Sequence, residues 1–187
     1  MFLYPYALGI VLGLSLAAPP GSVNAVIANE SLKSKWHGSS IGFGAMTADL
    51  TFFAIVYFTH GYLNGNILKI IYMAGGLIML YIGFSVLKSK MPSKSRKGNY
   101  FVGLSMGITN PFQILWWFTV GFFLLKELSI FSITGLYSGI LIWVFGFPFI
   151  VNRYGMKYEK IIKIVSAAII FGFAIYILYY GIMMIIK

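Results

Sequence analysis

The sequence contains no cysteine, and only 10% of its 187 residues are charged. The absence of cysteine excludes disulfide bonds, thiolate metal sites and thiol redox chemistry. Soluble domains carry about 25% charged residues, whereas this chain combines its low charge with 59% hydrophobic residues and a mean hydropathy of +0.87. Such a composition is incompatible with a water-soluble globule, so we expect a multi-pass protein of the cell (plasma) membrane.

Apolar stretches long enough to cross a bilayer, which takes about 20 residues, fill almost the whole chain. They cover residues 5–28, 39–59, 67–87, 100–125, 130–151 and 161–186. None has the alternating pattern of a barrel strand, so we interpret all of them as helices, which satisfy their own backbone hydrogen bonds in lipid. The expected fold class is therefore an all-α integral membrane protein with no room for an appended catalytic domain.

The two halves of the chain begin with similar sequences. Residues 13–16 read Gly-Leu-Ser-Leu and precede a Pro-Pro pair, and residues 103–106 read Gly-Leu-Ser-Met and precede Asn110-Pro111. Because each half holds three helices, the second copy would enter the membrane from the opposite side. We therefore expect six transmembrane helices as two inverted three-helix repeats, residues 1–88 and 100–187, joined by a basic cytoplasmic linker at residues 89–99.

Lysine and arginine are concentrated in alternate connections. Of the 14 basic residues, 11 fall in the first, third and fifth loops: Lys33, Lys35, Lys88, Lys90, Lys94, Arg96, Lys97, Arg153, Lys157, Lys160 and Lys163. Basic short loops stay in the cytoplasm, so these loops are predicted inside and both termini outside. The same rule explains the net charge of +10, and no nucleic-acid partner is expected.

A proline interrupts the first helix of each half. Neither Pro20 nor Pro111 can donate a backbone hydrogen bond, so each helix should break and leave carbonyl groups that only a polar cavity tolerates. A single proline kink is common in membrane helices. Kinks at equivalent positions in two sequence repeats instead indicate the substrate site of a secondary transporter. The expected substrate-binding or gating set is Pro20, Gly21, Ser22, Asn24, Thr109, Asn110, Pro111 and Gln113.

Asp49 is one of only four acids and lies near the middle of the second apolar stretch. A carboxylate at this depth costs about 3 kcal/mol on insertion scales, which indicates a compensating role. Two roles stay open: a coupling site for a proton or another cation, or a hydrogen-bonded residue that ties the second helix to the broken first helix. The small residues around it, Gly42, Gly44, Ala45 and Ala48, allow a neighbouring helix to approach closely.

The other polar and aromatic residues receive simpler interpretations. Glu30 should pair with the nearby Lys33. Trp143 is interpreted as an interfacial belt residue, whereas Trp116 and Trp117 lie deeper, where packing and a place on the substrate path are both open. No His and acidic residues cluster at the spacing of a metal site, so no metal and no cofactor are expected.

These motifs resemble the LysE/RhtB amino-acid exporter family over nearly the whole chain. The matching residues are Pro19, Pro20, Gly21, Ser22, Val23, Asn24, Gly38, Gly42, Gly44, Asp49, Asn110 and Pro111. Ser22 departs from the pattern, because the family usually has a second proline there. The resemblance implies export of amino acids or similar small metabolites, driven by the proton motive force. The implied partners are a small-molecule substrate and the lipid bilayer, with a homo-oligomer left open.

Other classes of function fit the sequence less well. Divalent metal cation efflux, an activity of relatives with a similar fold, is the alternative transport function, but one buried acid supplies few ligands. An enzyme is not expected, since thiol–disulfide carriers of this architecture need cysteine and intramembrane aspartyl proteolysis needs a second aspartate. A structural subunit would not need Asp49, Asn24 and Asn110 at membrane depth.

The predicted orientation can be tested in this cysteine-free chain. We expect Ser95→Cys, in the third loop, to resist a membrane-impermeant maleimide in intact cells and to react after permeabilisation, because its basic loop lies in the cytoplasm. Asn64→Cys, in the second loop, is the matched control and should react in intact cells. Reaction of Ser95→Cys without permeabilisation would reverse the orientation.

Overall fold

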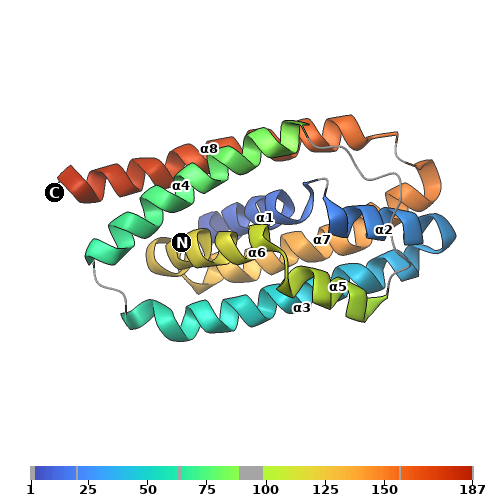
Figure 1. The fold of residues 1–187 in the computed structure, drawn as a ribbon, viewed down its shortest axis with the longest axis horizontal. Helices are drawn as coiled ribbons and strands as arrows, with labels where there is room; N and C mark the ends of the chain where they lie inside the picture. Colours follow the sequence, from blue (N-terminus) through green and yellow to red (C-terminus); the bar gives the residue numbers. More distant parts are fainter. Residues whose placement is uncertain (1–2, 20, 63–64, 89–98, 156, 187) are drawn as a thin grey trace.

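The computed structural model describes residues 3–19, 21–62, 65–88, 99–155 and 157–186, except for the side chains of residues 111, 159, 162, 163 and 166. Pro20 and most of the predicted linker, residues 89–98, therefore lie outside the described residues. Every described element is helical (Figure 1). In chain order these are α1 (Leu3–Ala17), α2 (Ser22–Lys33), α3 (Lys35–Thr59), η1 (His60–Tyr62), α4 (Gly65–Lys88), α5 (Tyr100–Ile108), α6 (Pro111–Trp116), η2 (Trp117–Gly121), η3 (Leu124–Leu128), α7 (Ile130–Tyr154) and α8 (Glu159–Ile186).

Within the described part of the chain, four helical segments are each long and apolar enough to cross a membrane. They are Lys35–Tyr62, Gly65–Lys88, Ile130–Tyr154 and Ala167–Ile186. Two bent pairs qualify only as combined spans: α1 with α2, bent by 82°, and Tyr100–Ile108 with Phe112–Leu128, bent by 60°. The number of spans is thus four to six, which confirms the all-helical membrane fold expected from the apolar stretches.

The second bend has a clear local cause. α5 ends at Ile108, and the Asn110 side chain accepts a hydrogen bond from Phe112 N at 3.1 Å as the N-cap of α6. Pro111 opens α6, a position where a helix does not need the missing N–H. Asn110 N donates to Gly107 O at 3.2 Å, so the carbonyl that Pro111 cannot reach still has a partner. The sequence therefore ends one helix and starts the next within two residues.

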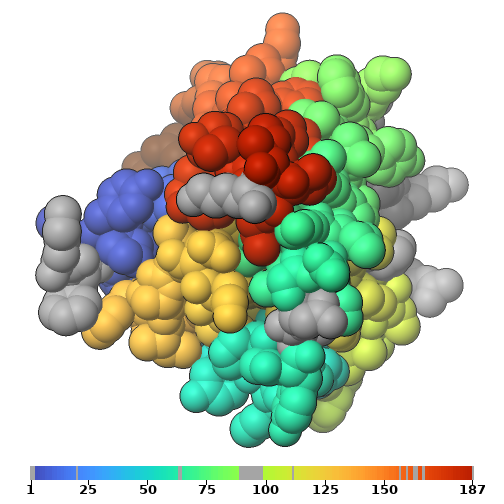
Figure 2. Space-filling view, turned by 90° about the vertical axis from the view of Figure 1, so that its left-hand side faces the viewer, coloured from blue at the N-terminus to red at the C-terminus, as the bar shows by residue number. Residues whose placement is uncertain are grey.

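The most extensive helix contacts join α1 with α7, α3 with α5, and α4 with α8. Figure 1 shows α4 and α8 side by side along one edge of the molecule, with α3 on the opposite edge and α1 and α7 between them. The end-on view in Figure 2 agrees with this arrangement, with α8 (red) above α7 (orange), α4 (green) to the right and the end of α3 below. The first segment of each bent pair thus packs on a helix from the other half of the chain.

Glycines set the distance between these helices. A Cβ atom on Gly135 of α7 would collide with the carbonyl oxygen of Tyr6 in α1. In the other pair, a Cβ on Gly44 of α3 would collide with the carbonyl of Tyr100, and one on Gly103 of α5 with that of Ile41. Small residues of this kind drive association in lipid by allowing backbones to touch. The sequence predicted that a neighbouring helix approaches closely around Gly44, and that helix is α5.

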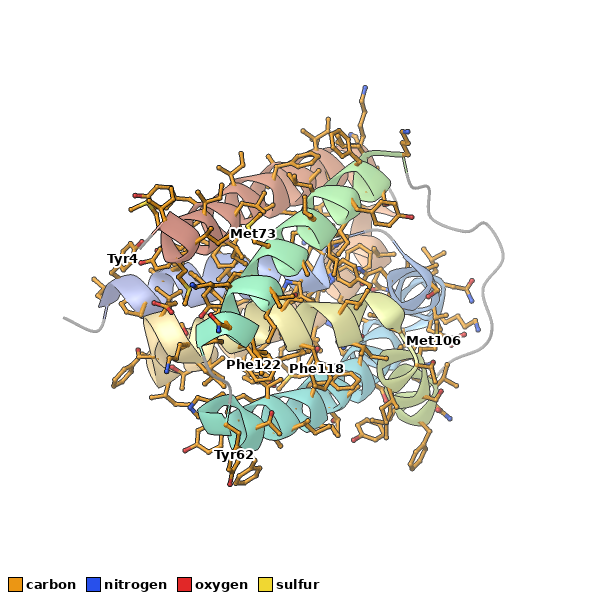
Figure 3. All side chains as sticks on the ribbon, turned by 60° about the vertical axis from the view of Figure 1, so that its left-hand side comes forward. Tyr4, Tyr62, Met73, Met106, Phe118 and Phe122 are labelled. Atoms are coloured by element: carbon orange, nitrogen blue, oxygen red, sulfur yellow. The ribbon has the colours of Figure 1, made fainter. Side chains whose placement is uncertain are left out.

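Large apolar side chains cover the outer surface as well as the interior. Trp116, Trp117 and Phe123 are fully buried in the core between the helices. Other large side chains, including Tyr62 and Phe118, are exposed (Figure 3). Soluble monomers rarely expose contiguous apolar surface, so this surface is suited to lipid.

The helix contacts predict that replacing glycine by alanine lowers stability at one position and does not lower it at another. Gly135→Ala should lower the stability of the detergent-solubilised protein by about 1 to 3 kcal/mol, because the new methyl group overpacks the α1–α7 contact. Gly172→Ala on α8 is the control, since nothing lies within 4 Å of its added Cβ and alanine favours a helix. Thermal unfolding midpoints measure both. Equal midpoints for the two variants would contradict the packing argument.

Candidate functional site

A cavity of about 720 Å³ lies between α2, α3, α4, α6 and α7. This volume falls within the range of small-molecule sites, about 300 to 1,000 Å³. Both helix breaks border it: Ala17, Pro19 and Gly21 come from the first, and Asn110 and Phe112 from the second. The two interruptions predicted from the prolines therefore meet at one site.

Asn24 holds the first break together. Its Nδ2 donates to Ala17 O at 2.6 Å and to Pro19 O at 2.8 Å. These carbonyls lie where α1 ends and cannot accept helical hydrogen bonds from a continuing helix. The Asn24 Oδ1 accepts a hydrogen bond from Trp143 Nε1 of α7 at 3.1 Å. The buried amide thereby replaces the lost backbone partners and fixes the break against α7.

Gln113 links the second break to α3. This buried side chain donates from Nε2 to Ala45 O at 3.3 Å, and its Oε1 accepts from Asn110 Nδ2 at 3.5 Å. Asn110 thus caps α6 with one end of its amide and contacts Gln113 with the other. The result is a short chain of neutral polar groups along the cavity wall.

Asp49 lies in the cavity wall on α3 and is only 4% exposed. Trp117 Nε1 donates to its Oδ1 at 2.7 Å. Trp117 is the first residue of η2, a π-helical turn, and such turns often occur at functional sites. Since Trp117 is not among the residues that line the cavity, it holds the acid from behind the wall.

An aromatic cluster of Phe53, Trp117 and Tyr137 lies behind Asp49. The ring of Trp117 stacks on Tyr137 with centroids 6.3 Å apart, and Phe53 lies 6.0 Å from Trp117 and 6.1 Å from Tyr137. Along α3 and α7 the cluster lies toward the second and fourth loops, whereas the cavity lies toward the first, third and fifth. The cluster therefore lies on the side of the cavity nearer the second and fourth loops.

The structure gathers most of the predicted site residues. The cavity is lined by Gly21, Ser22, Asn24, Asp49, Asn110 and Gln113. Thr109 lies apart from it, with its hydroxyl donating to Ser105 O at 2.8 Å. Pro111 opens α6, but its side chain, like all of Pro20, lies outside the described residues. The predicted ion pair of Glu30 with Lys33 is confirmed at 2.7 Å.

Sequence reasoning missed the roles of two tryptophans. The belt interpretation of Trp143 is wrong, because its ring lines the cavity and its N–H holds Asn24. Its position in the middle of the fifth apolar stretch, away from either end, was the available signal. Asp49 accepts its hydrogen bond from Trp117 in the fourth apolar stretch. The structural interpretation of Asp49 had instead predicted a hydrogen-bonded contact with the first helix.

Comparison with known proteins identifies a family and a similar protein. The family model described as "LysE type translocator" matches residues 14–181. A protein of Bacillus subtilis (strain 168) described as "Putative amino acid efflux protein YcgF" is 30% identical over 191 residues, which cover 88% of this chain and 91% of that protein. No solved structure matches the chain. The family resemblance is confirmed by the model match over most of the chain: the protein belongs to the LysE type translocator family.

Proposed function

We propose that this protein exports amino acids or similar small metabolites across the cell membrane as a secondary transporter coupled to the proton motive force. The observation that carries the proposal is one cavity bordered by two helix breaks, with the buried Asp49 in its wall. Discontinuous helices meeting at a polar site are typical of secondary transporters. The similarity to the amino acid efflux protein of Bacillus subtilis supports the substrate class.

Reciprocal packing supports an inverted repeat of residues 1–88 and 100–187. α1 opens the first half and packs on α7, which follows the bent pair of the second half. α5, the first segment of the second half, packs in the same way on α3 of the first half, and the third helices, α4 and α8, pair with each other. This exchange of partners is expected from a pseudo-twofold axis in the membrane plane.

The position of the cavity supports alternating access. With both termini outside, the ends of α3, α4 and α7 nearest the cavity face the cytoplasm, and the aromatic cluster behind Asp49 lies on the external side. A substrate would enter from the cytoplasm in this conformation. Movement of the two bent pairs relative to each other would then open the external side.

Asp49 is proposed as the proton-coupling residue. It is the one charged side chain among the described residues that line the cavity. An acid in this place can bind a proton while the cavity faces one side and release it on the other, whereas a neutral amide has no proton to release. The hydrogen bond from Trp117 would keep the side chain oriented throughout the cycle.

Replacement of Asp49 tests this coupling. Asp49→Asn keeps an amide oxygen that can accept hydrogen bonds from Trp117 and from an ammonium group, so we expect a folded protein that still exchanges substrate down its gradient, with a weaker apparent affinity. It should fail to concentrate substrate when a pH gradient is imposed on proteoliposomes. Trp117→Phe is the companion variant, because it removes the hydrogen bond and keeps the acid, and it should retain coupling. Uphill accumulation by Asp49→Asn at the wild-type level would leave Asp49 with a structural role only.

Replacement of the break residues tests the site. Asn24→Ala removes both donors to the carbonyls of Ala17 and Pro19, and Asn110→Ala removes the cap of α6. Each should weaken apparent substrate affinity by about 1 to 3 kcal/mol, since a buried polar group loses its partner. Exchange assays over a range of substrate concentrations measure the affinity.

Thr109→Ala is the matched control, because Thr109 lies outside the cavity lining. Its affinity should match that of the wild type. If Asn24→Ala and Asn110→Ala bind substrate as tightly as Thr109→Ala, the two breaks do not form the substrate site.

A further inference from the structure

We propose that the cavity is specific for amino acids with one ammonium group, one carboxylate and an uncharged apolar side chain, and that it rejects basic and acidic amino acids. This inference rests on the proposed export function and names the substrate class of the same site. It follows from the charges, backbone donors and apolar surface that line the cavity.

The described lining of the cavity carries a single charged side chain. Asp49 is the one acidic side chain there, and none of the described lining residues is lysine, arginine or histidine. A charge buried without a partner is costly, because the protein interior replaces water poorly. One carboxylate can therefore partner one ammonium group, and the described part of the lining offers no side-chain cation to an anionic substrate.

Backbone N–H groups at the start of α2 supply the donors for the substrate carboxylate. Gly21 is the N-cap residue, and the helix has no side-chain cap hydrogen bond. The first N–H groups of a helix lack intrahelical partners and attract anions. Ser22 and Val23 from this first turn line the cavity. At α6, by contrast, the Asn110 side chain already accepts from Phe112 N.

The surface left for the substrate side chain is uncharged and mainly apolar. α4 lines the cavity with Leu77, Ile78, Ile82 and Val86, together with the neutral hydroxyl-bearing residues Tyr81 and Ser85. Leu16, Met46, Ile140 and Val144 add further apolar surface from α1, α3 and α7. Transfer of an aliphatic or aromatic side chain from water to such a surface is favourable in proportion to the area buried.

These three features discriminate against charged side chains. The second ammonium of lysine would lie along the α4 wall without a carboxylate. The second carboxylate of glutamate would find no cation and would be repelled by Asp49. A substrate that leaves a buried polar or charged group unpaired is rejected far more strongly than one that differs by a single methylene. We therefore expect a preference for leucine over lysine or glutamate of about a hundredfold or more.

The first experiment is counterflow of labelled leucine in proteoliposomes that contain the wild-type protein, competed by unlabelled amino acids. Leucine and phenylalanine should compete at the lowest concentrations, and alanine should need about tenfold more, since it buries less apolar surface. Lysine or glutamate competing as well as leucine would overturn the inference and leave amino-acid export standing. Absence of exchange for every amino acid would overturn export as well.

The second experiment adds a carboxylate to the α4 wall. Ile78→Asp should raise the ratio of lysine to leucine transport at least about tenfold over its matched control Ile78→Asn, because the acid gives the second ammonium a partner. Ser85→Asp and Ser85→Asn form a second pair at an exposed lining position, where folding is less sensitive. An unchanged ratio in both pairs would contradict the assignment of α4 as the side-chain subsite.

Discussion

The constraint on which this structure depends is that backbone polar groups inside a bilayer must find partners within the protein. A break in a membrane helix exposes carbonyls that water cannot reach. At the first break the amide of Asn24 binds two such carbonyls, and at the second break Asn110 caps the helix that follows. Because each repair needs a polar side chain beside the break, a polar cavity forms where the two breaks meet. The site is therefore a consequence of how the helices are interrupted.

The same low dielectric limits the charge that the site can hold. A single carboxylate, Asp49, is retained with a hydrogen bond from Trp117 Nε1, and the remaining polar groups of the described lining are neutral. Neutral donors and acceptors can hold a zwitterion at less desolvation cost than paired charged side chains.

The sequence predicted the all-helical membrane fold, the two breaks and the acid, because each has a local signature: an apolar run, a proline, or a carboxylate at membrane depth. It did not predict the contacts of Trp117 and Trp143. The first joins residues 68 positions apart, on α3 and η2. The second joins residues 119 positions apart. Such contacts follow from how α2 packs on α7, and single-sequence patterns do not contain that pairing.

The two tryptophan hydrogen bonds also divide the molecule in an unexpected way. The bond of Trp143 to Asn24 lies within the unit of α1, α2 and α7, and that of Trp117 to Asp49 within the unit of α3, α5, α6 and η2. Each unit contains helices from both halves of the sequence and is closed by glycine contacts with a neighbouring backbone. The cavity lies between the two units and α4. The main contacts between the units are those of α3 with α2 and α7, so each of the two bonds orders one wall of the cavity without crossing from one unit to the other.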